Sequence, residues 1–269
     1  MKKLFNVLKI ILVILLASPL LISWIPSEVF ANIAPADLVE SGYLSALFVS
    51  FKDLSITLVA TLIFAMIISL LLGYVSVLSM KVGRAFTNIL NAVESIPSIL
   101  IALFCYAPVS GYLASHGSSA STTMSLLVFV LAATVTTLPE AVRSIAIPLT
   151  DLYNRKYSLS FRSYGFTKPR ILFVLMNTVL MRDTFKRVAA GILLKTLVLD
   201  CSFGFIIQLG FGSNGTPAHT SPGALIAAYR KALFPDSGSP ILFWLPSILL
   251  IAISVAFLIL LNKDKEENV

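Results

Sequence analysis

The sequence predicts an all-α integral membrane protein with about six transmembrane helices. Apolar residues make up 57% of the 269 positions and charged residues only 12%, whereas a soluble domain carries about a quarter charged residues. The apolar residues form long continuous runs without the alternation of a β-barrel strand, which favours helices. The net charge of +7 indicates basic cytoplasmic loops in such a chain, not a surface for nucleic acid.

Six segments approach the roughly 20 apolar residues that a spanning helix needs. The first follows Lys2 and Lys3 and could be a signal peptide. Its length of about 22 residues exceeds an h-region of about 7–15 and favours a retained helix. The fifth is the weakest prediction, because it contains Lys195 and Asp200. The segments are Leu4–Ile25, Ser55–Met80, Ile89–Val109, Thr122–Ala146, Val188–Phe211 and Ile241–Leu261.

The basic residues fall mostly on one side of this arrangement. With the N-terminus inside, the inner segments hold sixteen of the twenty Lys and Arg residues, which predicts that both termini are cytoplasmic. The largest inner loop is 148–187, and the outer loops are Pro26–Leu54, Ser110–Ser121 and Gly212–Pro240. We divide the chain into an N-terminal helix with the first outer loop (1–49), a core (50–263) and a short cytoplasmic tail (264–269).

Several sequence motifs of catalysis are absent. The chain has no GxxxxGK[ST] phosphate loop, no HExxH, no GxSxG and no CxxC, so we expect no ATP site, no cofactor and no enzyme activity of its own. His116 and His219 fall in different outer loops, without a second ligand nearby. The sequence therefore predicts no metal site.

The basic loop contains a short amphipathic segment. Tyr157, Phe161 and Tyr164 recur at i, i+4 and i+7, a spacing that places them on one helical face. Gly165 follows, where a helix is expected to stop, and Pro169 suits the first turn of a second helix. On these grounds alone the segment could lie on acidic lipid or dock on a protein.

Tyr157–Asn177 resembles the EAA loop of ABC-importer permeases. Tyr157, Arg162, Gly165 and Ile171 stand at the matching places, whereas Leu159 replaces the usual Glu and Ser160-Phe161 replaces the Ala pair.

The resemblance extends over residues 50–263. Ser221–Tyr229 is similar to the S-W-G-x-x-L-x-x-A stretch of C-type dipeptide, oligopeptide and nickel permeases. Leu209–Gly212 is similar to their L-G-L-G element, and Asp200 stands roughly where they carry a Glu. The usual C-terminal G-D-x-L-R-D-x-x-D-P tail is missing.

The resemblance implies a type I ABC importer permease fold in a bacterial plasma membrane. It implies a second homologous permease subunit, two cytoplasmic ATPase subunits that carry ATP and magnesium, and an external solute-binding protein. The solute would be a peptide, a nickel or other metal chelate, or a similar small solute. The resemblance also implies a coupling helix that contacts the ATPase, and the candidate residues are Tyr157, Phe161, Arg162, Tyr164, Gly165, Lys168 and Arg170.

Charged residues and prolines inside the spans are candidates for the translocation pathway or a gate. These candidates are Glu94, Pro97, Asp200 and Phe203. For Pro97 we favour the alternative that it is a tolerated membrane proline without a role in gating. Glu140 and Arg143, at i and i+3, could pair with one another.

Lys195 and Asp200 lie about 140° apart around a helix. They are therefore expected to contact other helices or a second subunit. An alternative function is a non-transport scaffold or immunity protein whose basic loop binds membrane lipid or a regulator.

Overall fold

The protein is described by a computed structural model that covers residues 2–40, 42–116, 121–211, 220–234 and 239–262. All regular elements in this part of the chain are helices, which confirms the predicted all-α class. They are α1 (Lys2–Ile22), α2 (Glu28–Ala31), α3 (Ala36–Glu40), α4 (Tyr43–Leu78), α5 (Met80–Ser95), α6 (Ser98–His116), α7 (Ser121–Asn154), α8 (Lys156–Ser163), α9 (Lys168–Met176), α10 (Val179–Phe211), α11 (Pro222–Ala228), the 3₁₀ turn η2 (Arg230–Leu233) and α12 (Ile241–Asn262).

Four helices are long and apolar enough to cross a membrane, so the chain is a multi-pass membrane protein. These are Tyr43–Leu78, Met124–Asn154, Val179–Leu209 and Ile241–Leu260. A fifth span is counted if α5 and the start of α6 cross together as one bent pair. The apolar part of α1, Asn6–Ile22, is shorter than the others. The described residues thus support four or five spans where the sequence predicted about six.

The predicted third span, Ile89–Val109, is wrong as a continuous helix. It is divided between α5 and α6, which meet at an angle of 88°. Pro97 lies at the break, and Ile96 before it is extended, with φ −91° and ψ 130°. A proline has no N–H to donate and pushes the preceding residue out of the helical region, which explains the break at this position.

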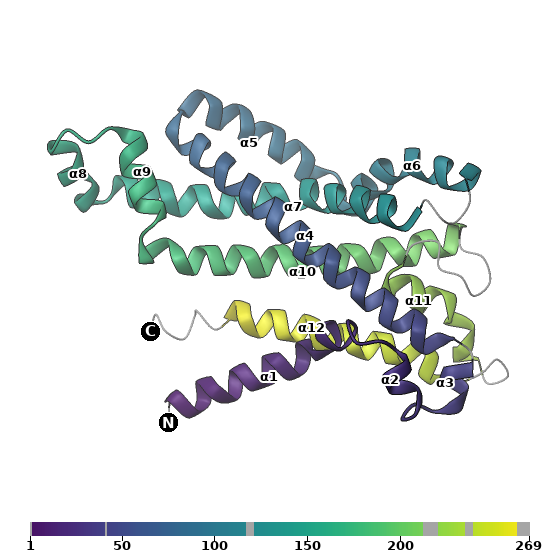
Figure 1. Cartoon of the computed structure of the whole chain (residues 1–269). Coiled ribbons are helices and arrows are strands. Elements are labelled where there is room, and N and C mark those ends of the chain that lie inside the picture. The colour runs from purple at the N-terminus through teal and green to yellow at the C-terminus, as the bar shows by residue number, and fades with distance from the viewer. Residues whose placement is uncertain (1, 41, 117–120, 212–219, 235–238, 263–269) are drawn as a thin grey trace.

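Three other helices extend beyond the predicted spans. The helix α4 begins at Tyr43, inside the predicted first outer loop. The helix α7 continues through Pro139 and Pro148 to Asn154, and α10 begins at Val179. Much of the predicted loop 148–187 is therefore helical, and α8 and α9 form a helical hairpin between the ends of α7 and α10 (Figure 1).

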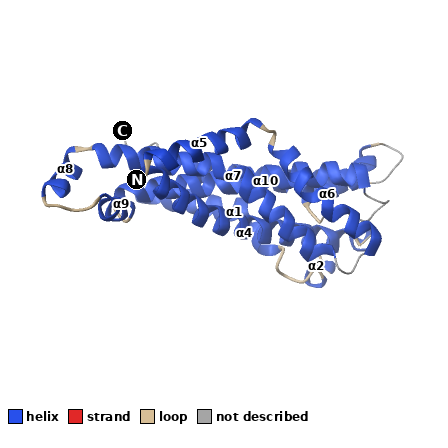
Figure 2. Cartoon of the chain, turned by 90° about the horizontal axis from the view of Figure 1, so that it is seen from above, coloured by secondary structure: helices blue, strands red, loops and turns tan. Residues whose placement is uncertain are grey.

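The long helices α4, α7 and α10 pack together, and α12 lies beside α10 and α1 (Figure 1, Figure 2). The start of α1, the end of α12 and the α8–α9 hairpin lie at one end of the molecule, and α2, α3 and α11 lie at the other. This agrees with the predicted placement of both termini on the same side as the basic loop.

The helix α11 is seated directly on α10 at the end opposite the hairpin. Ser221 caps α11 by accepting a hydrogen bond from the Ala224 N–H at 3.2 Å, and the Ser221 side chain is fully buried. Gly204 of α10 lies against Ser221, and Gly223 of α11 lies against the backbone of Cys201. A Cβ at either glycine would overlap its neighbour, so the two helices are close because these residues lack side chains.

Candidate functional site

The α8–α9 hairpin contains the predicted helix stop at Gly165. Gly165 has φ +79°, and its N–H donates to the Arg162 carbonyl at 3.0 Å. The Phe166 N–H donates to the Phe161 carbonyl at 3.1 Å, and the two rings meet edge-on at 5.8 Å. This is a complete Schellman motif with its apolar contact. The helix stop predicted at Gly165 and the proline predicted in the first turn of α9 are both confirmed.

The predicted aromatic residues of α8 do not share one environment. Phe161 is half-buried against Phe166, within an apolar cluster that also contains residues of α7 and α9. Tyr164 is 80% exposed and Leu159 is 52% exposed. The side chain of Tyr157 lies outside the described residues. Leu159 and Tyr164 are thus two large side chains that α8 and the residue after it present outward, and neither is basic. Phe173 and Val174 of α9 are exposed as well.

The predicted cationic residues of the hairpin have partners within the chain. The Arg162 guanidinium stacks on the Tyr153 ring at 3.9 Å and donates to the Tyr153 carbonyl at 2.7 Å. The Arg170 guanidinium lies 4.8 Å from the centre of the Phe166 ring. Arg162 therefore holds the hairpin in its orientation relative to the end of α7, whereas Arg170 contacts the turn within the hairpin.

Two further contacts join the hairpin to the end of α4. The Lys168 ammonium donates to the Leu78 carbonyl at 3.0 Å, and the Tyr74 hydroxyl donates to the Pro169 carbonyl at 3.1 Å. Lys168 also lies 5.4 Å from the centre of the Tyr153 ring. The hairpin is thus attached both to α7 and to the turn between α4 and α5.

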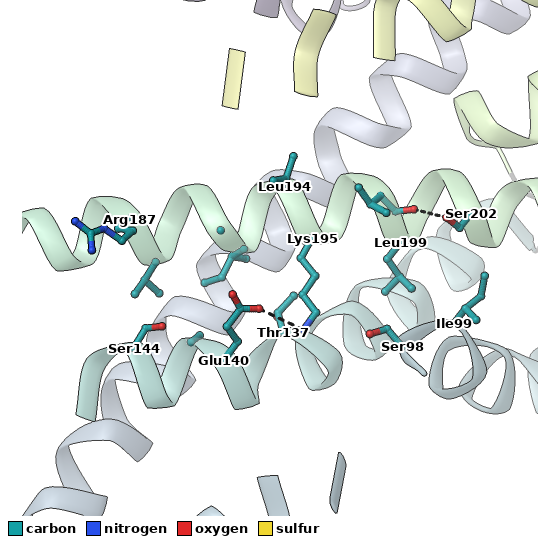
Figure 3. A pocket seen from close by; sticks show the side chains of 15 residues that line it. Ser98, Ile99, Thr137, Glu140, Ser144, Arg187, Leu194, Lys195, Leu199 and Ser202 are labelled. Carbon is teal, nitrogen blue, oxygen red and sulfur yellow. Dashed lines mark hydrogen bonds and ion pairs between the residues drawn. The ribbon is translucent and has the colours of Figure 1, made fainter. Parts of the chain in front are cut away.

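A hollow of about 650 Å³ lies between α7 and α10 (Figure 3). Glu140 and Lys195 point toward one another across it, and their Oε2 and Nζ atoms are 3.5 Å apart. This confirms that Lys195 contacts another helix. The rest of the lining is mostly apolar, with hydroxyl groups from Ser98, Thr137, Ser144 and Ser202.

The expected pair of Glu140 with Arg143 does not form. Arg143 donates instead to Glu94 at 2.6 Å and to Asn91 at 2.8 Å, both on α5. Glu140 and Arg143 thus pair with different neighbouring helices, α10 and α5. Glu94 lies in the last turn of α5 and Pro97 just after it, and neither lines the hollow, which begins at Ser98.

Asp200 and Phe203 do not line the hollow. Asp200 is 1% exposed. Phe203 is fully buried, with the rings of Tyr106 and Phe129 each 5.1 Å away. Their proposed part in a gate stays a prediction.

The hydroxyl groups of the hollow were not predicted from the sequence, although their spacing is a usable signal. Thr137, Glu140 and Ser144 recur at i, i+3 and i+7 on α7, and Gly191, Lys195 and Ser202 recur on one face of α10. Small and polar residues at helical spacing within an apolar helix indicate a face that is not turned to lipid.

Among the described residues no group of three or more His, Cys, Asp or Glu side chains could hold a metal ion. A scan against protein-family models and a search of curated proteins both return no match for this chain.

Proposed function

We propose that the chain is a membrane-spanning permease subunit of an ATP-driven ABC importer, in which the α8–α9 hairpin is the coupling element. The observation that carries this proposal is the hairpin itself. It is a two-helix projection closed by Gly165 in the left-handed region, and it presents Leu159 and Tyr164 outward. An exposed apolar and aromatic pair on a short helix is suited to fit a groove on a protein partner.

The ATPase subunits would supply the energy, because the sequence has no phosphate loop of its own. Each ATPase would bind ATP and magnesium and would contact the hairpin of one permease subunit. In this proposal the hairpin and both termini lie in the cytoplasm of a bacterial cell, which agrees with the concentration of Lys and Arg residues on that side.

The hollow between α7 and α10 would be this subunit's half of the translocation pathway. It combines an ion pair with four hydroxyl groups at the depth of the spans, and polar side chains at that depth favour water or solute over lipid. A second, homologous permease subunit would cover its open side. A solute-binding protein outside the cell would deliver a peptide, a metal chelate or a similar small solute.

Purification of the full-length chain from its own cell membrane in a mild detergent tests the proposal. We expect two kinds of partner: ATPase subunits with a phosphate loop, and a second permease chain. A preparation that lacks any ATPase would overturn the proposal and would favour the scaffold or immunity function.

Two glycine variants separate a coupling role from general damage. Gly165→Trp is expected to remove the ATPase from the preparation, because φ +79° is unfavourable for any L side chain and the hairpin must change shape. Gly42→Trp is the matched control: Gly42 also has positive φ, at +66°, and also has open space around a Cβ, but it lies at the other end of α4. Retention of the ATPase by both variants would count against the hairpin as the contact.

A further inference from the structure

We propose that α5 is a pivoting arm that connects the hairpin to the hollow, and that Lys168 and Arg143 are the positioning residues at its two ends. This proposal rests on the proposed function, since it names the route by which a movement of the coupling hairpin reaches the pathway.

The first end of the arm is the turn between α4 and α5. Ser79 separates the two helices and is extended, with φ −125° and ψ 116°. The Lys168 ammonium donates to the carbonyl of Leu78, the last residue of α4. Such terminal carbonyls lack a partner within their own helix. Lys168 therefore contacts the chain at the residue immediately before the break.

The position of Lys168 is unusual for its own helix. It is the first residue of α9, where a positive charge opposes the helix dipole. Its ammonium is half-buried at the C-terminal end of α4, where a positive charge is favourable. The Tyr74 hydroxyl adds a second link by donating to the Pro169 carbonyl. Both contacts bind the start of α9 to the end of α4.

The arm itself is loosely attached between its ends. Among the α5 residues whose side chains are described, Gly83 alone is buried. A Cβ there would overlap the Ser76 carbonyl, so α5 touches α4 closely at Gly83, near the turn. With 16 residues, α5 is about 24 Å long. A small rotation at the turn is therefore amplified along the helix.

The second end of the arm is held by α7 and leads into the hollow. Arg143 donates to Asn91 and Glu94 in the last turns of α5. The chain then breaks at Pro97, and the next two residues, Ser98 and Ile99, line the hollow. A pivot of α5 moves these residues directly, and Arg143 determines the position in which the arm rests.

The test measures the position of α5 in the full-length chain, reconstituted in lipid nanodiscs without partner subunits. Spin labels are placed at Ala92→Cys on α5 and Ile251→Cys on α12, both exposed, in a background of Cys105→Ser and Cys201→Ala. Pulsed electron–electron double resonance gives the distribution of distances between the two labels. Lys168→Met and Arg143→Gln are each expected to shift this distribution by more than its original width, and Lys168→Arg is expected to restore it.

Two further variants keep the test decisive. Lys186→Gln removes a cation from an exposed pair with Asp183 at 3.2 Å, and it should leave the distribution unchanged. Tyr74→Phe removes a single hydroxyl, so it should produce a smaller shift in the same direction even if Lys168→Met is poorly folded.

The outcomes separate this inference from the proposed function. An unchanged distribution in both Lys168→Met and Tyr74→Phe overturns the arm, whether or not an ATPase co-purifies with the chain. A shifted distance distribution supports the arm. If no ATPase co-purifies with the chain, the same shift still supports the arm, although the proposed importer function is then wrong.

Discussion

The two ends of the molecule are held by different kinds of contact. At the α11 end, glycines let two helices touch backbone to backbone: Gly223 lies against Cys201, and Gly204 lies against the buried Ser221. At the hairpin end, an apolar cluster that includes Leu172 and Leu175 packs the helices together. Long polar side chains are added to it there, of which Lys168 and Tyr74 donate to backbone carbonyls.

The two kinds of contact are expected to control different properties: the stability of the protein at the α11 end, and the positions of the helices at the hairpin end. A close-packed backbone contact has no spare volume and cannot adjust without moving a whole helix. A partly exposed hydrogen bond contributes only about 1 kcal/mol, because water replaces the lost partner. We therefore expect changes at the α11 end to alter the stability of the protein, and changes at the hairpin end to alter the arrangement of its helices.

The largest expected effect is that of Gly223→Ala. The new Cβ would overlap the backbone carbonyl of Cys201, which is not a flexible group that can rotate away. Overpacking of this kind costs about 3 kcal/mol at the upper end of its usual range. Thermal unfolding of the detergent-solubilised chain measures the loss. Gly191→Ala on α10 is the control: its Cβ meets open space, and alanine favours the helix by about 1 kcal/mol.

A smaller loss is expected for Gly83→Ala at the hairpin end. Its Cβ would overlap the Ser76 carbonyl in the same manner. Because α5 is exposed along its length, it can pivot away, and we expect a loss of only about 1 kcal/mol. The label pair on α5 and α12 should report the displacement. Equal destabilisation by Gly83→Ala and Gly223→Ala would remove the distinction between the two ends.

Local rules were sufficient for part of this fold. Gly165 and Pro169 were predicted to end one helix and begin the next, and the structure confirms both. Both signals depend only on the residues next to Gly165 and Pro169, and the sequence shows those residues directly.

Prolines show where local rules fail. Pro97 breaks its helix and Pro139 does not, although both lie within apolar runs. Pro139 is buried, and the helices packed around α7 keep the chain straight, whereas Ile96 and Pro97 are exposed and nothing opposes the break. The deciding difference is tertiary packing, which no local pattern contains.

The candidate site, like the fold, was predictable only in part from the sequence. The sequence identified Lys168 and Arg162 as important cations but assigned both to an outside partner. Their acceptors, the carbonyls of Leu78 and Tyr153, are backbone atoms that carry no sequence signature. Likewise the partners of Glu140 and Arg143 lie on distant segments of the chain.

The next prediction compares two serines, one at each end. Ser221→Ala removes a buried cap of α11 and should cost about 1 kcal/mol. Ser163 is exposed, and its hydroxyl donates only to the Ser160 carbonyl within α8. Ser163→Ala should therefore change the unfolding temperature little. A larger loss for Ser163→Ala than for Ser221→Ala would show that α8 depends on this hydroxyl more than α11 depends on its cap.

The smallest expected effect concerns two ion pairs on α10. Lys195 joins α10 to Glu140 of α7, whereas Lys186 pairs with Asp183 on the same helix, near the hairpin. An exposed pair contributes about 0.5 kcal/mol at most, and salt screens it. We expect Lys186→Gln to lower stability by about 0.3 kcal/mol or less, and added salt to abolish even that difference. A loss above about 1 kcal/mol would mean that polar contacts near the hairpin do stabilise the fold. In that case the contacts at the hairpin end, like those at the α11 end, would contribute to the stability of the fold.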